Sequence, residues 1–582
     1  MKNKENQATL KRVLQYAKPY RAYSVAAFIL AMGYVLFTLL SPVLVGRAID
    51  QVVDTGLVRF EIIIKILVGV GICVLLASLC QWGMNVFTQK LSIYTARDFR
   101  NAAFARLNNV PLNYIDTHPH GDIINRMVND AELVSDGLQQ GLTQMIPGVV
   151  TIVGTLVIML VLNPLIALVV VLITPLSIFV ASFIAGRSRK LFVKQSQASG
   201  ALSAYINETV ANQTVVKAFG QESYCQKEFE KITDALFASG LKSQFYSSIS
   251  NPCTRFVNGI VYAAVCVIGA INAIYGNITV GQLSCFLTYA NQYTKPFNEV
   301  TGVLTQLQTG LASAKRLFEV IDQPLEIAET TCPQMPVKEI GSVQAEHVFF
   351  SYVPQKPLIE DFNLQVKRGQ KVAIVGPTGC GKTTLINLLM RFYDVNSGDI
   401  KIDHISIYDM QRRDLRSLYG MVLQETWLQN ATVGENIAYG KPDAGKEEIV
   451  AAAKAAYAHS FIKRLPNGYD TVITAGGGNI SAGQKQLLCI ARIMLTHPDM
   501  LILDEATSSI DTRTEMLIQA AFEKLMQGRT SFVVAHRLST IQNADIILVM
   551  NNGHIIEQGN HETLLAQKGF YANLYNSQFA VN

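Results

Sequence analysis

The residues with the clearest chemical meaning form a glycine-rich stretch between a short apolar run and an apolar helical pattern. The run KVAIV at 371–375 predicts a buried strand, and LINLLMRF after Thr384 predicts a helix. The spacing between them is G-x-x-x-x-G-K-T, which in this context is typical of a phosphate-binding loop. The loop residues are Gly376, Pro377, Thr378, Gly379, Cys380, Gly381, Lys382, Thr383 and Thr384.

Each residue type in this loop has a distinct task. Glycines let backbone N–H groups wrap the phosphates, and the following helix adds the partial positive charge of its N-terminus. Lys382 supplies a point charge at the β- and γ-phosphates, and the Thr383 hydroxyl faces Mg²⁺. Taken alone, the motif has an alternative interpretation, a chance match in a glycine-rich turn.

A second pattern argues against chance. The apolar run from Met500 to Leu503 predicts another buried strand, and Asp504 and Glu505 follow it directly. In phosphate-loop proteins an aspartate at a strand end holds Mg²⁺. A neighbouring glutamate is placed to polarise the attacking water. Two adjacent acids could be a surface pair, but after a buried strand downstream of such a loop they predict a hydrolytic site.

Between and around these motifs, the sequence resembles the ATPases of the ABC family. The stretch ISAGQ at 480–484 is similar to the LSGGQ signature of that family, and SSID at 508–511 is similar to its D-loop. Three single residues match further family positions: Tyr352 the aromatic that stacks on adenine, Gln424 the Q-loop, and His536 the switch histidine. The motifs occur in the order that the family has.

The first half of the chain has a different composition. Overall, 49% of the residues are hydrophobic and only 16% are charged, against about 25% charged residues in ordinary soluble proteins. A spanning helix needs about 20 mostly apolar residues, and the alternative is a set of buried core helices. The expected spans are 23–46, 62–84, 142–163, 164–186, 254–275 and 281–302.

The gaps between these spans alternate between short and long. The two long gaps have amphipathic helical patterns, so we expect helices that leave the bilayer and turn back. The second long gap is rich in Lys and Arg, whereas the outer loops offer little beyond Arg47 and Arg59. Positive residues stay on the cytoplasmic side, so both long gaps, both termini and the ATPase domain are expected in the cytosol, as in a multi-pass protein of a bacterial plasma membrane.

The tip of each long gap carries a short motif, at 114–122 and at 201–208. Either tip could dock sideways on a cytosolic domain or be an ordinary solvated helix turn. The layout resembles type I ABC exporters, and this resemblance identifies the tips as coupling helices. The expected fold class is a membrane all-α six-helix transmembrane domain (1–322), a linker (323–341) and an α/β P-loop NTPase domain of the ABC type (342–582).

The resemblance also implies a mechanism. Two such chains pair head to tail and sandwich ATP between the phosphate loop of one and the signature of the other. The expected catalytic residues are Glu505, His536 and Gln424, with Tyr352 on the base. Mg²⁺ is expected on Thr383, Gln424 and Asp504, partly through water. The residues that bind the partner's ATP in trans are Ser481, Gly483 and Gln484.

The sequence departs from the family at two positions on the surface offered to the partner. Ala482 stands where the family prefers glycine, and Ala475 where many exporters carry glutamate. The residues that act on this chain's own nucleotide are intact. This split resembles one half of a heterodimeric exporter, the half that carries the catalytic glutamate. A heterodimer with a second ABC half-transporter is therefore expected, and a homodimer is the alternative. We expect the Ala482 methyl group to restrict the backbone.

The substrate is less well defined by the sequence. Net charge is only +5, which gives no argument for nucleic acid. Aromatic and amide residues in the last two spans suit amphipathic molecules such as drugs, and Lys295 is expected to face the translocation path. A peptide exporter, a lipid flippase, or a regulatory ATPase or channel are the alternatives. The side chains considered are Phe256, Asn258, Tyr262, Asn272, Phe286, Tyr289, Asn291, Gln292, Tyr293, Lys295 and Glu299.

Overall fold

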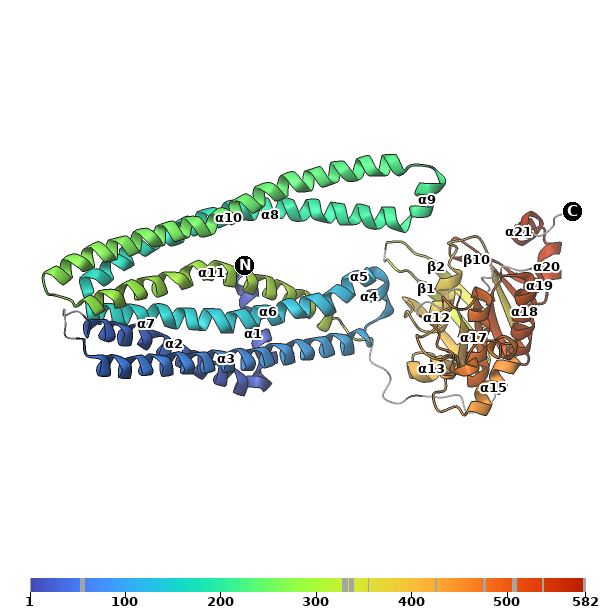
Figure 1. Cartoon of the computed structure of the whole chain (residues 1–582). Helices are drawn as coiled ribbons and strands as arrows, with labels where there is room; N and C mark the ends of the chain where they lie inside the picture. The colour runs from blue at the N-terminus through green and yellow to red at the C-terminus, as the bar shows by residue number, and fades with distance from the viewer. Residues whose placement is uncertain are drawn as a thin grey trace. The chain divides into compact units, whose positions relative to one another are not determined.

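The computed structural model divides into two compact units (Figure 1). One comprises residues 1–109 and 118–323, and the other comprises residues 110–117 and 324–582. The short segment 110–117 therefore belongs with the ATPase part although it lies within the first half of the sequence. The structure describes residues 2–52, 58–326, 333, 340–353, 355–423, 426–474, 478–504, 510–535 and 538–578.

The first unit consists of long helices. The predicted extension of the spans beyond the bilayer is confirmed, because α3, α8 and α10 have 48, 48 and 53 residues. The helices are α1 (Lys2–Ala17), α2 (Arg21–Asp50), α3 (Phe60–Leu107), α5 (His120–Asn125), α6 (Ala131–Gln140), α7 (Ile146–Leu162), α8 (Pro164–Ala211), α9 (Gln213–Ala218), α10 (Glu222–Ile274) and α11 (Val280–Ile321). Short helical turns at Lys18–Tyr20, Arg126–Asp130 and Gly141–Met145 join neighbouring helices.

Local sequence explains where these helices begin and end. The Asn163 side chain accepts hydrogen bonds from Leu165 N and Ile166 N, so α7 and α8 are joined by a tight, capped turn. Pro164 fits the first position of α8 because that residue needs no hydrogen-bonded N–H. Thr279 and Gln282 form a capping box at the start of α11. The predicted tight connection between the third and fourth spans is confirmed.

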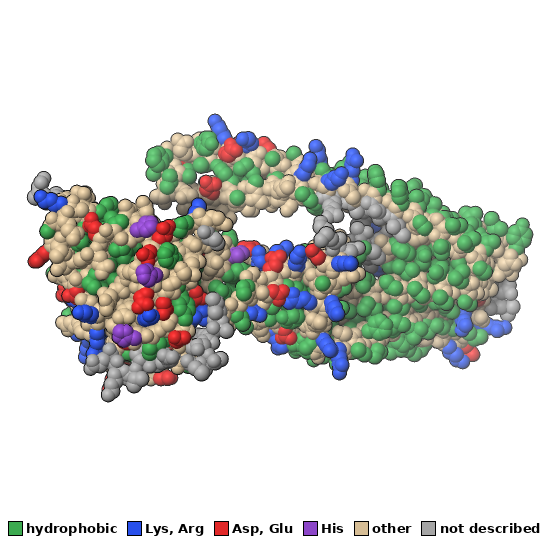
Figure 2. Space-filling view, turned by 180° about the vertical axis from the view of Figure 1, so that it is seen from behind, with side chains coloured by type: hydrophobic (Ala, Val, Ile, Leu, Met, Phe, Trp, Pro, Cys, Tyr) green, Lys and Arg blue, Asp and Glu red, His purple; other side chains and the backbone are tan. Residues whose placement is uncertain are grey.

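On the face of this unit that Figure 2 shows, hydrophobic side chains cover much of the surface. Among the described residues, four helical runs are long and apolar enough to cross a membrane, and α8 adds a shorter apolar stretch, Pro164–Leu176. Those runs are Lys4–Asp50, Phe60–Leu107, His120–Leu162 and Glu222–Ile274. The sixth expected span lies in α11, whose middle carries polar residues, among them Asn291 and Lys295.

Helices α2 and α11 approach each other closely. A Cβ atom added at Gly281 would lie 2.0 Å from the Gly46 carbonyl oxygen, so the crossing requires glycine. Asp50 accepts hydrogen bonds from Gly281 N at 2.8 Å and from the Thr279 hydroxyl at 2.9 Å. The Tyr289 hydroxyl donates to the Leu39 carbonyl oxygen. This pairing fixes which face of α11 is buried.

That burial corrects part of the expectation for the substrate path. Phe286 and Tyr289 are fully buried and Tyr293 is 7% exposed, all within one hydrophobic cluster. These aromatic residues therefore pack the helices together. Of the aromatic side chains considered for the path, Phe256 and Tyr262 of α10 are exposed. The side chain of Glu299 lies outside the described residues.

The second unit contains two sheets. The mixed sheet has the strand order β10-β9-β3-β8-β7-β6, in which β9, β3, β8, β7 and β6 are parallel. The antiparallel sheet has the order β2-β1-β4-β5. The strands are β1 (Val343–Phe350), β2 (Ile359–Val366), β3 (Lys371–Val375), β4 (Ser397–Ile402), β5 (Ile405–Ser406), β6 (Tyr419–Val422), β7 (Met500–Asp504), β8 (Thr530–Val534), β9 (Ile546–Asn551) and β10 (His554–Gly559).

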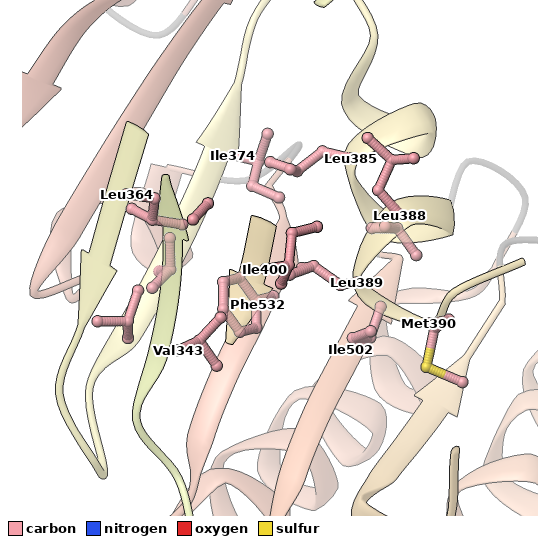
Figure 3. Close-up of a cluster of buried hydrophobic side chains, with 14 of the residues drawn as sticks. Val343, Leu364, Ile374, Leu385, Leu388, Leu389, Met390, Ile400, Ile502 and Phe532 are labelled. Carbon is pink, nitrogen blue, oxygen red and sulfur yellow. The ribbon is translucent and has the colours of Figure 1, made fainter. Parts of the chain in front are cut away.

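One hydrophobic cluster joins both sheets to helix α12 (Figure 3). It includes Val343 of β1, Ile374 of β3 and Leu385 of α12, each fully buried. The helices of this unit are α4 (Leu112–Thr117), α12 (Lys382–Leu389), α13 (Arg412–Leu418), α14 (Val433–Ala438), α15 (Lys446–Ala455), α16 (His459–Ile462), α17 (Ala482–Thr496), α18 (Thr512–Met526), α19 (Leu538–Gln542), α20 (His561–Ala566) and α21 (Phe570–Gln578).

Candidate nucleotide site

The glycine-rich loop connects β3 to α12, as its sequence predicts. Gly376 has φ +155°, and a Cβ atom there would lie 2.2 Å from the Met550 carbonyl oxygen, so no larger residue fits. Gly381 caps α12 with φ +103°, in the left-handed region that favours glycine. The loop backbone is therefore shaped by its neighbours as well as by its own sequence.

The side chains of the loop divide into two groups. Lys382 Nζ donates to the carbonyl oxygens of Gly376 at 2.8 Å and Pro377 at 3.0 Å, so its ammonium group lies against the loop. Thr383 is exposed at the start of α12, where first-turn N–H groups have no partner within the helix. Cys380 and Thr384 are buried. The sequence pattern placed all nine residues around the phosphates, but these two side chains point into the domain.

The parallel strands bring the other motifs to the same sheet edge. Val534 of β8 is in register with both Ile374 of β3 and Asp504 of β7. Neighbouring strands lie about 4.8 Å apart, which places Asp504 about 10 Å from the end of β3. Ligands of such sheets bind outside the carboxyl ends of the strands.

Three expected catalytic residues follow these strands but lie outside the described residues. In the sequence, Gln424 comes after β6, Glu505 after β7 and His536 after β8. The described strands end at the edge where the glycine-rich loop begins. The order of the strands is therefore compatible with the expected roles, which remain predictions.

The expected base-stacking residue, Tyr352, lies beside α12 and is 41% exposed. Its hydroxyl donates to Thr384 Oγ1 at 3.3 Å. Its ring packs edge-on against Tyr393, with ring centroids 4.9 Å apart and planes at 89°. The Tyr393 hydroxyl in turn donates to Asp116 Oδ2. A chain of contacts thus runs from the expected adenine site to the segment 110–117.

This arrangement favours docking for the first cytosolic tip. Asp116 lies in α4, which belongs to the same compact unit as Tyr393. Burial and the hydrogen bond to Asp116 raise the pKa of Tyr393, so the phenol stays protonated and able to donate at neutral pH. Sequence reasoning singled out the segment 114–122, which contains Asp116, but missed Tyr393, which had no motif around it. Docking by the second tip, at 201–208 near the end of α8, remains a prediction.

The signature-like segment begins helix α17. Ser481 and Gln484 form a capping box, with Gln484 N donating to Ser481 Oγ at 3.3 Å. Gly483 is buried against α18, where a Cβ atom would lie 2.4 Å from Thr514 Cγ2. Ala482 is exposed, and it is absent from the residues with positive φ. In this conformation the methyl group therefore causes no backbone strain, because the first position of a helix suits alanine, and its effect on the partner's ATP remains a prediction. Ala475 lies outside the described residues.

Comparison with known proteins agrees with this geometry. The family model described as the ABC transporter transmembrane region matches residues 24–297, and the model described as ABC transporter matches residues 359–508. The chain is 43% identical, over 85% of its length and 78% of the relative, to the fatty acid ABC transporter ATP-binding/permease protein of Mycobacterium bovis. It is 34% identical, over 98% and 94%, to the ATP-dependent lipid A-core flippase of Syntrophus aciditrophicus.

A solved structure shows the same fold over nearly the whole chain. A bacterial Atm1-family ABC exporter with ATP bound superposes with a TM-score of 0.79 and 28% identity, covering 97% of this chain and 99% of that one. The fold and the site define an ATPase fused to a helical transmembrane domain. The chain belongs to the ABC transporter family. It is an ATP-driven exporter half-transporter of the type I fold, integral to the membrane, which works with a second ABC half.

The contact between Tyr393 and Asp116 yields a first prediction. Tyr393→Phe keeps the ring against Tyr352 but removes the hydroxyl. We expect ATP binding to stay within about twofold of wild type and transport per ATP hydrolysed to fall severalfold, because one charge-assisted hydrogen bond is lost. Both activities are measured in proteoliposomes. Tyr457→Phe, on a partly exposed tyrosine of the same unit, is the control. Unchanged coupling in Tyr393→Phe would contradict this role.

Proposed function

We propose that this chain exports amphipathic molecules by alternating access, driven by ATP bound at the edge of its parallel sheet. The observation that carries the proposal is a polar stripe on α11. Thr288, Asn291 and Lys295 are exposed and lie at positions i, i+3 and i+7, on one face of the helix. Polar residues within a membrane span mark water-filled paths or partner contacts. A path with one polar face and apolar walls suits molecules with a polar end and an apolar body.

The names of the relatives support this substrate class. Fatty acids and the lipid A core, named for the Mycobacterium bovis and Syntrophus aciditrophicus proteins, both combine apolar chains with polar groups. One of these relatives is named as a flippase. The proposal therefore includes the movement of a lipid from one leaflet of the membrane to the other. A regulatory ATPase or channel is the other alternative, and no feature of the described residues specifically favours it.

The ATP site is proposed to act with Mg²⁺. Thr383 and Asp504 offer a hydroxyl and a carboxylate at one sheet edge, which are hard oxygen donors of the kind that Mg²⁺ prefers. Gln424 is proposed to join them. The ion would neutralise charge on the phosphates, while Glu505 orients and polarises the attacking water and His536 contacts the γ-phosphate. Lys382 and the loop N–H groups hold the phosphates in place.

The second half of the site is proposed to come from the partner. In the paired form, the start of α17 faces the partner's ATP, with Ser481, Gly483 and Gln484 as the contacting residues. Capping fixes the backbone of Ser481 and Gln484, which orients the N-terminus of the helix toward an anion. We propose a heterodimer, because Ala482 alters this donated surface while the residues for the chain's own nucleotide are intact.

Transport in sealed vesicles tests the proposal. The complex purified with its partner half is reconstituted in proteoliposomes and supplied with Mg²⁺-ATP and a fluorescent phospholipid or lipophilic dye. We expect ATP-dependent movement of the amphiphile away from the side that carries the ATPase domain. ATPase activity without directed movement of any amphiphile would favour the regulatory ATPase or channel.

Lys295 provides a second prediction. An uncompensated lysine facing lipid at the bilayer centre costs about 2.5–3.5 kcal/mol on insertion scales, and no described residue forms an ion pair with Lys295. If it lines an aqueous path, Lys295→Ala should assemble normally and change the relative transport rates of anionic and cationic amphiphiles severalfold.

Thiol labelling checks the same residue directly. In a background without the nine native cysteines, Lys295→Cys should react with a membrane-impermeant maleimide in at least one nucleotide state. Ala290→Cys, at a buried position of the same helix, is the unreactive control. Protection of Lys295→Cys in every nucleotide state would exclude this residue from the path.

A further inference from the structure

The chain that leaves α11 toward the ATPase unit is held at two points by contacts between carboxylates and arginines. Asp322, in the helical unit at the end of α11, accepts hydrogen bonds from the Arg12 guanidinium at 2.6 and 2.8 Å. Glu326, in the ATPase unit, lies 3.5 Å from Arg412 Nε and 3.9 Å from Arg416 Nη2, both of α13. The two carboxylates are four positions apart, so the chain between them spans at most about 14 Å.

The attachment of Glu326 is partly buried. Arg412 is only 5% exposed, and its guanidinium also lies 3.6 Å from Asp394 Oδ2. Removing a partner from a buried charge is strongly destabilising, whereas an exposed ion pair contributes little. Two carboxylates, one from the linker and one from the ATPase domain, thus face the same buried guanidinium. Glu326 therefore ties the linker to a fixed part of the domain.

The same group of charges reaches the end of the phosphate-loop helix. Arg416 Nε donates to the Met390 carbonyl oxygen at 3.3 Å, and its Nη2 donates to the Arg391 carbonyl oxygen at 3.1 Å. These carbonyls belong to the turn that ends α12. Helix α12 has eight residues and begins at Lys382, so it is about 12 Å long. The phosphate loop and the arginine that contacts Glu326 therefore lie at opposite ends of one short helix.

The turn at 390–394 also holds the first cytosolic tip. Tyr393 donates to Asp116 of the segment 110–117, which follows α3. The next residue, Asp394, faces the arginine that contacts the linker. Two segments that lead to membrane helices, one from α3 and one from α11, are thus attached next to each other, directly after α12.

We propose that Glu326 is a positioning residue that couples the ATP site to α11. The proposal rests on the export function above and specifies how ATP controls the proposed path. A displacement of the end of α12 when ATP binds or leaves is carried by Glu326 and passed to Asp322 through the short chain between them. Pro324, within that chain, has a fixed φ that limits its slack. The displacement reaches the helix that carries Lys295.

Insertions in the linker test this role without changing any contact. Two glycines between Gln323 and Pro324 lengthen the chain between the two attached carboxylates. The same insertion after Thr331, beyond Glu326, is the control. In proteoliposomes of the full complex, we expect the first insertion to lower transport per ATP hydrolysed by about fivefold or more, the size of a typical coupling between sites. ATP affinity should stay close to wild type. The control insertion should keep wild-type coupling, whereas a requirement for total linker length alone would affect both.

Substitutions at Glu326 address the charge itself. Glu326→Gln keeps the size of the side chain and removes its charge, so it should uncouple transport as the first insertion does. Glu326→Asp keeps the charge and should restore part of the coupling. Glu346→Gln removes the carboxylate of an exposed ion pair with Lys401 in the same unit and should change nothing. Wild-type coupling in both Glu326→Gln and the first insertion would overturn the proposal.

A readout on α11 itself separates this inference from the export function. Gln308, exposed near the end of α11, is changed to cysteine in a complex without other cysteines, and its maleimide labelling rate is compared with and without ATP and vanadate. We expect the nucleotide to change this rate, and Glu326→Gln to remove most of the change. If so, but no amphiphile is moved, the role of Glu326 is supported and export fails. If amphiphiles are moved and the change survives in Glu326→Gln, Glu326 only anchors the linker and the inference is wrong.

Discussion

Replacing Glu505 with glutamine is expected to leave ATP binding intact and to lower ATP turnover by about two to four orders of magnitude, the usual size of a general-base contribution. Glutamine has the size of glutamate but lacks the carboxylate that polarises the attacking water. Asp504 and the glycine-rich loop, which would hold Mg²⁺ and the phosphates, are unchanged. Turnover and nucleotide affinity are measured on the complex purified with its partner half.

Lys382→Ala is the matched comparison, because it removes a phosphate-binding charge instead of the carboxylate. Lys382 Nζ lies against the loop carbonyl oxygens, so its loss should weaken ATP binding as well as turnover. The two variants therefore separate binding from chemistry. Near wild-type turnover in Glu505→Gln would show that another group activates the water.

The ATPase half shows what sequence can predict well. The strands KVAIV and MLIL appear as β3 and β7, and the loop joins β3 to α12. Short segments of sequence are enough to predict these elements. A buried parallel strand is a continuous apolar run, and the loop glycines allow backbone conformations that other residues rarely adopt. The pairing of β3 and β7 with β8 then brings Asp504 to the loop edge. Sequence order alone suggested this proximity without giving the register.

Contacts between distant residues were harder to predict. Asp116 and Tyr393 are separated by 277 positions, and nothing near Tyr393 marks it as a partner. On α11, composition suggested that Tyr289 and Tyr293 face a cavity, yet the close approach of Gly46 and Gly281 turns that face into the core. A helical pattern shows which residues share a face, but the neighbouring helix decides which face is buried.

The two ATP sites of the working complex are expected to be unequal, with this chain supplying the complete catalytic carboxylate. The residues that are expected to act on this chain's own ATP match the family, among them Tyr352, Lys382, Asp504 and Glu505. The surface that this chain is expected to offer to the partner's ATP differs from the family at Ala475 and Ala482. The simplest partner is a half with an intact signature, which completes this chain's site, and a poor catalytic carboxylate at the other site, where this chain's altered signature lies.

The structure changes the physical reason for this inequality. Ala482 has no positive φ, so its methyl group does not strain this chain. The residue is exposed at the start of α17, beside first-turn N–H groups that are available to an anion. We propose that an added methyl group at that point takes up space needed by the γ-phosphate of the partner's nucleotide. The cost therefore arises only when the two halves close on ATP.

Separate expression of the halves tests this inequality. This chain alone should show less than about a tenth of the ATPase activity of the pair, because each site would then depend on the altered signature; a deficit of 1.4 kcal/mol in closure suffices for that factor. In the pair, vanadate with a photoreactive ATP should label mainly this chain's phosphate loop. Ala482→Gly should raise the activity of the chain alone and leave labelling of its own loop in the pair unchanged. A stable homodimer of the unmodified chain with robust ATPase and transport would overturn the heterodimer, since its two identical sites would both work with Ala482 in place.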